Sequence, residues 1–124
     1  MGLTINSVKY GKELDYIDMG YGSFYWMRFE LAKMVGYEYY GENPFELRLR
    51  WDEQKEKEEL TRFFLHPDSD GKIMQSDLKK LYQDFKDLDF NDKKFDGKTA
   101  KSAFENFLPF LKRTVESNAH LEFG

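Results

Sequence analysis

One stretch of the chain, residues 66–77, has residue types in the order of a calcium-binding loop. In an EF-hand loop of twelve residues, oxygen ligands project from alternate positions and a glycine at the sixth position makes a sharp turn. With Gly71 as the sixth residue, the first, third, fifth, eighth and twelfth positions are His66, Asp68, Asp70, Ile73 and Asp77. The pattern therefore indicates a helix-loop-helix centred on a divalent-cation site.

The ligands that this alignment predicts are the side-chain oxygens of Asp68, Asp70 and Asp77 and the carbonyl oxygen of Lys72. Two positions depart from the motif. His66 presents nitrogen where calcium prefers oxygen, and Asp77 is one methylene shorter than the glutamate that normally closes the coordination sphere. No second loop of this kind is found in the sequence. Calcium is thus the one cofactor that the sequence suggests, and we expect no other.

Three other interpretations of the loop stay open. In the first, Asp68 and Asp70 accept backbone N–H bonds, Gly71 takes a positive φ and Ser76 caps the next helix. In the second, the loop gathers a transition metal such as zinc, although further ligands are not obvious in a chain without cysteine. In the third, His66 is a general base oriented by one of the aspartates. Because no nucleophile or substrate pocket accompanies it, we expect no enzyme.

Aromatic residues form a second kind of candidate site. Tyr37, Tyr39 and Tyr40, with Trp26 and Trp51, would frame a groove for a peptide or a ring-containing ligand. Tyr and Trp are favoured at protein interfaces, although core packing explains them equally well. The main functional hypothesis is therefore a non-enzymatic domain that binds a protein partner, and the alternative is a degenerate EF-hand-like site for calcium.

Composition restricts the remaining classes. The chain has 124 residues, so we expect residues 1–124 to form a single domain. Its formal net charge of -4 provides no basic footprint for a phosphate backbone, so we expect no nucleic-acid partner. No secretion signal and no span of membrane length is recognised, so we expect a cytoplasmic protein without a membrane partner. The absence of cysteine agrees with a reducing compartment.

Helical periodicity dominates the elements that must position these residues. Apolar residues recur at helical spacing after Ser23, a candidate cap, until Gly36 offers a stop. Further helices are expected over about 52–64, 76–88 and 99–118, with a kink at Pro109 in the last.

Extended structure is expected only at the margins. Residues 3–6 alternate as a short strand or arm before a turn at 9–12, and a brief strand is expected at 45–49. Residues 37–44 are expected to form an aromatic loop, the acidic residues between 13 and 18 a solvated loop, and His120 part of a solvated tail. The predicted fold class is mainly α, with about four helices, an EF-hand-like helix-loop-helix and a minor β element that pairs the N-terminus with the tail or with 45–49.

The chain also resembles, over most of its length, a group of small bacterial proteins of unassigned function that also occur around mobile elements. The residues that carry the resemblance are Gly2-Leu3-Thr4-Ile5, Tyr21-Gly22-Ser23-Phe24, Arg28, Leu31, Ala32, the loop from Leu65 to Gly71, and Leu121-Glu122-Phe123. The group's loop reads His-Ser-Asp-Cys-Asp-Gly, so this chain departs from it at Pro67 and Ser69 and lacks the thiol. The resemblance implies a compact, mostly helical fold in which His66, Asp68, Asp70 and Gly71 act as a unit, but it implies no activity.

Overall fold

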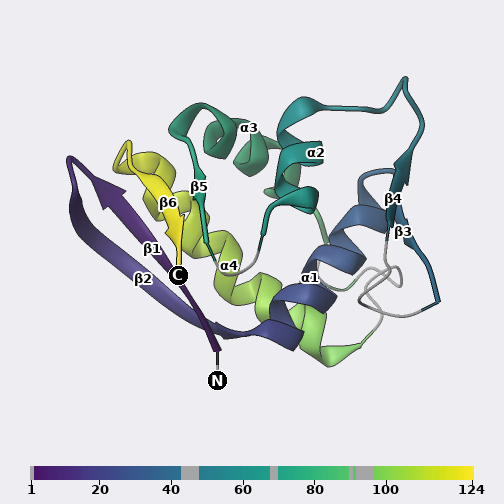
Figure 1. The fold of residues 1–124 in the computed structure, drawn as a ribbon, viewed down its shortest axis with the longest axis horizontal. Coiled ribbons are helices and arrows are strands. Elements are labelled where there is room, and N and C mark those ends of the chain that lie inside the picture. The colour runs from purple at the N-terminus through teal and green to yellow at the C-terminus, as the bar shows by residue number, and fades with distance from the viewer. Residues whose placement is uncertain (1, 43–47, 68–69, 90, 92–96) are drawn as a thin grey trace.

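The computed structural model describes residues 2–42, 48–67, 70–89, 91 and 97–124. Of these residues, 47% are helical and 28% lie in strands, so the fold is α/β and the expectation of a mainly α fold was wrong. In chain order the elements are β1 (Gly2–Lys9), β2 (Lys12–Gly20), α1 (Tyr21–Met34), β3 (Tyr37–Tyr40), β4 (Arg48–Trp51), α2 (Glu58–Leu65), β5 (Lys72–Ile73), α3 (Gln75–Phe85), α4 (Lys98–Glu116) and β6 (His120–Phe123). A four-stranded sheet lies at one end of the molecule and the β3–β4 ribbon at the other (Figure 1).

The N-terminal hairpin is longer than the sequence indicated. Strands β1 and β2 are joined at Tyr10 and Gly11, both with positive φ (54° and 73°), a turn geometry that matches the twist of paired strands. The expected strand at 3–6 is confirmed within β1, whereas the acidic loop expected at 13–18 is wrong because those residues belong to β2. Acidic residues have low strand propensity and masked the alternation.

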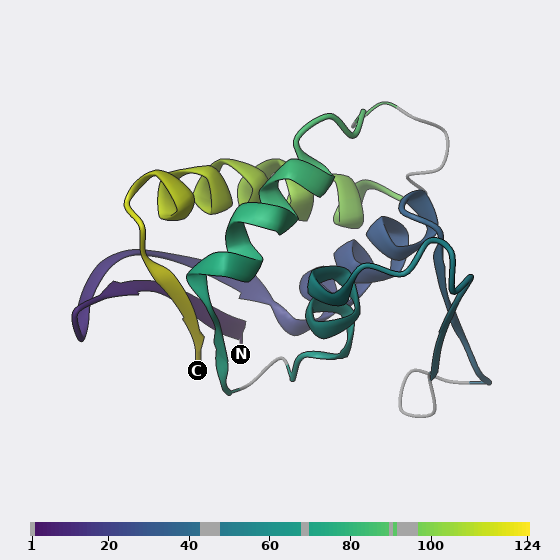
Figure 2. The ribbon, with the colours of Figure 1, turned by 90° about the horizontal axis from the view of Figure 1, so that it is seen from above.

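The tail completes the main sheet. Strand β6 pairs antiparallel with β1, placing Phe123 opposite Ile5, and the strand order is β2-β1-β6-β5. Of the two partners expected for the N-terminal strand, the tail is the one observed, but the sheet has four strands and not two. The two ends of the chain lie close together (Figure 2). His120 is part of β6, half-buried, with its Nε2 2.8 Å from an Oε2 of Glu122, so the expectation of a solvated tail residue was wrong.

The second sheet is the ribbon of β3 and β4, in which Tyr37 pairs with Trp51. Two expectations were wrong in this region. Part of the aromatic loop expected at 37–44 is strand β3, and the helix expected from about residue 52 begins only at Glu58. Residues 45–47 of the expected strand at 45–49 lie outside the described residues, and β4 begins at Arg48. The ribbon forms because the stacked rings of Tyr37 and Trp51, 5.5 Å apart, support the strand pair.

The remaining helices agree with the periodicity to within a few residues, but their caps differ. Helix α1 starts after Gly20, so Ser23 lies in its first turn, and it ends before Gly36, whose φ is 91°. Helix α3 starts after Met74 without a side-chain cap, so Ser76 does not serve as one. Helix α4 continues through Pro109, whose missing N–H removes one backbone bond.

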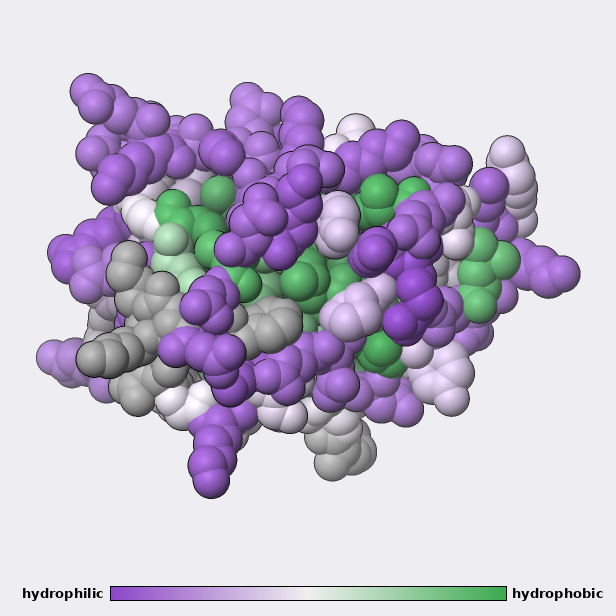
Figure 3. All heavy atoms as spheres, turned by 180° about the vertical axis from the view of Figure 1, so that it is seen from behind, coloured by the Kyte–Doolittle hydropathy of each residue, from purple (hydrophilic) through white to green (hydrophobic). Residues whose placement is uncertain are grey.

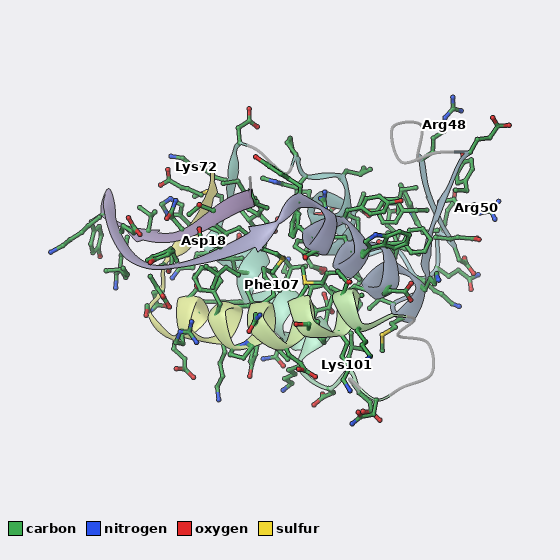
Figure 4. The ribbon with its side chains drawn as sticks, turned by 90° about the horizontal axis from the view of Figure 1, so that it is seen from below. Asp18, Arg48, Arg50, Lys72, Lys101 and Phe107 are labelled. Carbon is green, nitrogen blue, oxygen red and sulfur yellow. The ribbon has the colours of Figure 1, made fainter. Side chains whose placement is uncertain are left out.

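The core between the main sheet and the helices is built largely of phenylalanine. Phe24, Phe63, Phe85, Phe104 and Phe107 are each at most 1% exposed. Phe107 lies inside the molecule on α4 in the view from below (Figure 4). On the face seen in Figure 3, hydrophobic residues show only in small patches among hydrophilic ones, as on ordinary solvent-facing surface.

Candidate functional site

The loop that follows α2 is organised around the imidazole of His66. Its Nδ1 lies 2.6 Å from the carbonyl oxygen of Pro67, and its Nε2 lies 3.1 Å from the carbonyl oxygen of Lys72. The ring also packs on Phe123, with 4.5 Å between centroids. Both ring nitrogens thus contact backbone oxygens of the loop and of β5. Strand β5 lies at the edge of the sheet, and the His66 ring covers its Lys72 carbonyl.

The guanidinium of Arg28, on α1, binds the backbone at the start of this loop. The Nη1 of Arg28 donates to the carbonyl oxygens of Phe63, at 3.1 Å, and His66, at 2.6 Å, at the C-terminal end of α2. The Cζ of Arg28 also lies 4.4 Å from the ring centroid of Phe24, which is 5.8 Å from that of Phe123. The Phe63 carbonyl also accepts the N–H of His66 at 3.3 Å, so Arg28 adds a charged donor to the cap of α2 and complements the negative end of the helix dipole.

Gly71 is required in the loop for two reasons. Its φ is 89°, a conformation that L side chains rarely adopt. A Cβ at this position would also lie 3.2 Å from Nε2 of His66. The backbone N–H of Phe123 donates to the Gly71 carbonyl at 3.0 Å. We call Phe24, Arg28, His66, Gly71 and Phe123 the loop cluster; its residues come from three of the four segments on which the resemblance is based.

The predicted cation ligands are placed as follows. Asp68 lies outside the described residues, and Asp70 is exposed. The carbonyl of Lys72 contacts His66. Both oxygens of Asp77, in the first turn of α3, accept hydrogen bonds from Arg62, at 2.6 and 2.7 Å, and these bonds hold the pKa of Asp77 below its usual range. Among the described residues, no group of three or more His, Cys, Asp or Glu side chains is arranged to hold a metal ion.

A groove of about 600 Å³ lies beside the loop, between α2 and the segment from β5 to α3. Its lining is mostly apolar, and it includes the side chains of Leu65 and Met74, which are 58% and 56% exposed. The paired Arg62 and Asp77 also contribute to its lining.

A second hollow, of about 500 Å³, lies between α1 and the β3–β4 ribbon. Its lining residues are Phe29, Lys33, Gly36, Tyr37, Glu38, Tyr39, Arg50, Trp51 and Asp52. Tyr37, Tyr39 and Trp51, three of the five residues expected to frame an aromatic groove, thus line one hollow, whereas Trp26 and Tyr40 do not.

Trp26 instead belongs to a chain of rings that leads to this hollow. Ring centroids are 5.0 Å apart for Tyr25 and Trp26, 5.5 Å for Trp26 and Phe29, and 6.1 Å for Phe29 and Tyr39. We call Tyr25, Trp26, Phe29 and Tyr39 the aromatic row. Trp26 is 46% exposed although it contacts a ring on each side, so a large apolar surface is held in a fixed position facing solvent.

The tyrosine hydroxyls in the hollow are engaged with α2. The Tyr39 hydroxyl donates to the carbonyl of Phe64 at 2.6 Å, and burial raises the pKa of Tyr39 to about 12. The Tyr37 hydroxyl accepts from the N–H of Lys57 at 3.0 Å and lies 2.9 Å from Oγ1 of Thr61. The hydroxyls therefore fix the two rings, of which that of Tyr39 is partly exposed and that of Tyr37 is buried beneath the hollow.

Cations border the row and the hollow. The Nζ of Lys33 lies 4.6 Å from the Phe29 centroid, and Cζ of Arg50 lies 5.1 Å from that of Tyr40. Arg48 and Arg50 point away from the body of the molecule at the ribbon (Figure 4). Sequence reasoning missed Phe29, Lys33 and Arg50 as site residues; the alternation of Arg48, Leu49, Arg50 and Trp51 was the signal for a strand with one cationic and one apolar face.

Comparisons of the chain with protein-family models, curated proteins and solved structures gave no match. The resemblance to the small bacterial group stays a prediction. No helix within the described ranges is both long and apolar enough to cross a membrane.

Proposed function

We propose that the protein is a non-enzymatic interaction domain that binds a segment of a partner protein at the aromatic row and the adjoining hollow. The observation that carries this proposal is the half-exposed Trp26, fixed between Tyr25 and Phe29. Rigid aromatic side chains at the surface lose little entropy on binding, and Trp, Tyr and Arg are the residues most enriched among binding hot spots.

The border of the site indicates the chemistry of the partner. The side chains of Lys33 and Arg50 are 42% and 61% exposed and lie against rings, while the chain as a whole has a formal net charge of -4. Both cations have a carboxylate partner within the chain, since Lys33 pairs with Glu30 at 3.2 Å and Arg50 with Glu38 at 2.7 Å, and an acidic residue of the partner would share or replace these pairs. The partner segment that fits best has an apolar side chain for the row and hollow and an acidic residue for the cationic border.

Other features support a binding role rather than catalysis. Both ring nitrogens of His66 contact backbone oxygens. The histidine that the sequence suggests as a general base is therefore better explained as a residue that stabilises the loop. The acidic net charge supports a protein partner over a nucleic acid, and the lack of cysteine supports a cytoplasmic location.

Selection of peptides from a random display library on the immobilised protein tests the proposal. Enriched peptides are expected to combine apolar and acidic residues and to bind Trp26→Ser at least about 30-fold more weakly than wild type, the ratio that corresponds to a hot spot of about 2 kcal/mol. Tyr10→Ser is the matched control, because Tyr10 is 95% exposed at the far hairpin and its loss leaves the row intact. Equal affinity of the enriched peptides for Trp26→Ser and wild type would refute the site.

The runner-up is a degenerate EF-hand-like cation site at residues 66–77. Two observations favour it: Gly71 has the positive φ that the turn of such a loop requires, and Ile73, at the eighth position, is buried. Against it, Arg62 holds both oxygens of Asp77, and His66 contacts the Lys72 carbonyl.

A calcium titration followed by the backbone amide of Gly71 separates the two proposals. We expect no saturable shift in the wild type below millimolar calcium, because binding would have to break the Arg62–Asp77 pair. If the loop has any affinity, Arg62→Gln is expected to respond at lower calcium than the wild type, whereas Lys79→Gln, an exposed change of equal charge on α3, is not. A wild-type response at micromolar calcium would make the cation site the leading proposal.

A further inference from the structure

Two carboxylate side chains are largely buried, that of Glu59 at the start of α2 and that of Asp84 at the end of α3. Glu59 is 8% exposed as a residue, and the side chain of Asp84 is also 8% exposed. One oxygen of each, Oε2 of Glu59 and Oδ2 of Asp84, is buried without any hydrogen-bond partner. A buried acceptor without a donor is costly, and a carboxylate is costlier than a neutral group.

The surroundings of the pair are well defined. Lys57, just before α2, places its Nζ 2.8 Å from the other oxygen of Asp84, Oδ1. Lys80, one turn before Asp84 on α3, adds a second positive charge, and Tyr37 on β3 approaches Lys57 through its hydroxyl. Lys57 therefore pairs directly with Asp84, whereas Glu59 interacts with the charges of Lys57 and Lys80 at longer range.

We propose that Glu59 and Asp84 form a pH-sensitive clasp between α2 and α3, in which Glu59 takes up one proton from solvent as the pH falls. The proton adds to Glu59 and converts an acceptor oxygen into an O–H donor, while Nζ of Lys57 keeps its contact with Oδ1 of Asp84. In the clasp, this O–H is the donor that the unpartnered Oδ2 of Asp84 lacks.

The electrostatics agree with this assignment of the proton. Burial raises the pKa of Glu59 above its usual range, and the charge of Asp84 raises it further, while Lys57 and Lys80 act in the opposite direction. A raised pKa in the folded state means that the fold binds the proton more tightly than the unfolded chain does. The contribution of Glu59 to stability is therefore complete below the ordinary glutamate pKa and is lost as the pH rises through the folded-state value.

Carbon-detected NMR of the side-chain carboxyl groups, recorded from pH 3 to pH 8, tests the clasp directly. Glu59 is expected to titrate at a clearly higher pH than Glu56, an exposed glutamate three residues earlier that serves as the internal reference. Asp84→Asn should move the Glu59 midpoint toward that of Glu56. Titration of Glu59 together with Glu56 would overturn the proposal.

Two further variants keep the test decisive if Asp84→Asn does not fold. Lys57→Gln, at a half-exposed side chain, removes a positive charge and should move the Glu59 midpoint to higher pH. Glu59→Gln supplies a permanent N–H donor, so its urea midpoint should exceed that of the wild type at pH 8 and approach it at pH 4, whereas Glu56→Gln should follow the wild type at both. A Glu59→Gln protein that is less stable than the wild type at pH 8 would contradict the clasp.

Discussion

Replacement of Phe63 by alanine is expected to lower the free energy of unfolding by about 3–5 kcal/mol, the range for truncating a buried phenylalanine. Phe63 is 1% exposed and its ring contacts those of Phe24, Phe64, Phe85 and Phe107, at centroid distances of 5.5 to 6.3 Å. The residue therefore joins α1, α2, α3 and α4, and no single neighbour can move to fill the cavity. A loss of this size is a large part of the total stability of a domain, which is about 5–15 kcal/mol.

Urea denaturation followed by far-UV circular dichroism measures this loss. Leu65→Ala is the matched control, because Leu65 lies on the same helix but is 58% exposed, and its truncation should change the stability by no more than about 0.5 kcal/mol. Equal effects of the two changes would show that the buried ring at position 63 is not the centre of the core.

Replacement of Arg28 by methionine is expected to lower the free energy of unfolding by about 1.5–3 kcal/mol, the range for a hydrogen bond that involves a charged group. Methionine keeps an apolar contact with Phe24 but cannot donate to the carbonyls of Phe63 and His66. The end of α2 and the loop after it should therefore open more readily, which links this residue to the loop cluster and not only to global stability.

Hydrogen exchange distinguishes the local effect from the global one. In Arg28→Met, amides from about residue 65 to residue 73 should exchange faster than the global loss of stability accounts for, while amides in α4 should follow the global loss. Arg48→Met removes the same charge from an exposed position on β4 and should leave both regions unchanged. Uniform acceleration throughout the chain would contradict the role of Arg28 as the clamp of the loop.

The loop shows how far local sequence reasoning reaches. Gly71 and Ile73 were placed correctly because a positive φ and a buried apolar position are local requirements of the turn. The fate of the predicted ligands was not local, since Asp77 is held by Arg62, fifteen positions away, through two charge-assisted hydrogen bonds. A motif of twelve residues contains no information about a guanidinium on the preceding helix.

The aromatic site also combines features that local sequence predicts with contacts that it does not predict. The sequence grouped five aromatic residues, of which Tyr37, Tyr39 and Trp51 line one hollow and Trp26 and Tyr40 do not. It did not indicate that Phe29 and Lys33 of α1 complete that hollow, because this depends on how the ribbon packs against the helix. Cross-strand pairing of Tyr37 with Trp51 is a contact over a gap of more than ten residues, and periodicity does not report such contacts.

By itself the sequence determined the approximate positions of α1, α3 and α4, the stop at Gly36, and the turn at Gly71, because helix periodicity and positive φ act over a few residues. Only the tertiary structure decided that the fold is α/β. Strand β2 carries acidic residues that hide its alternation, and β6 becomes a strand by pairing with residues 5–8 at the other end of the chain. Strand formation is stabilised by partners that are distant in sequence, whereas a helix finds its hydrogen bonds within its own residues.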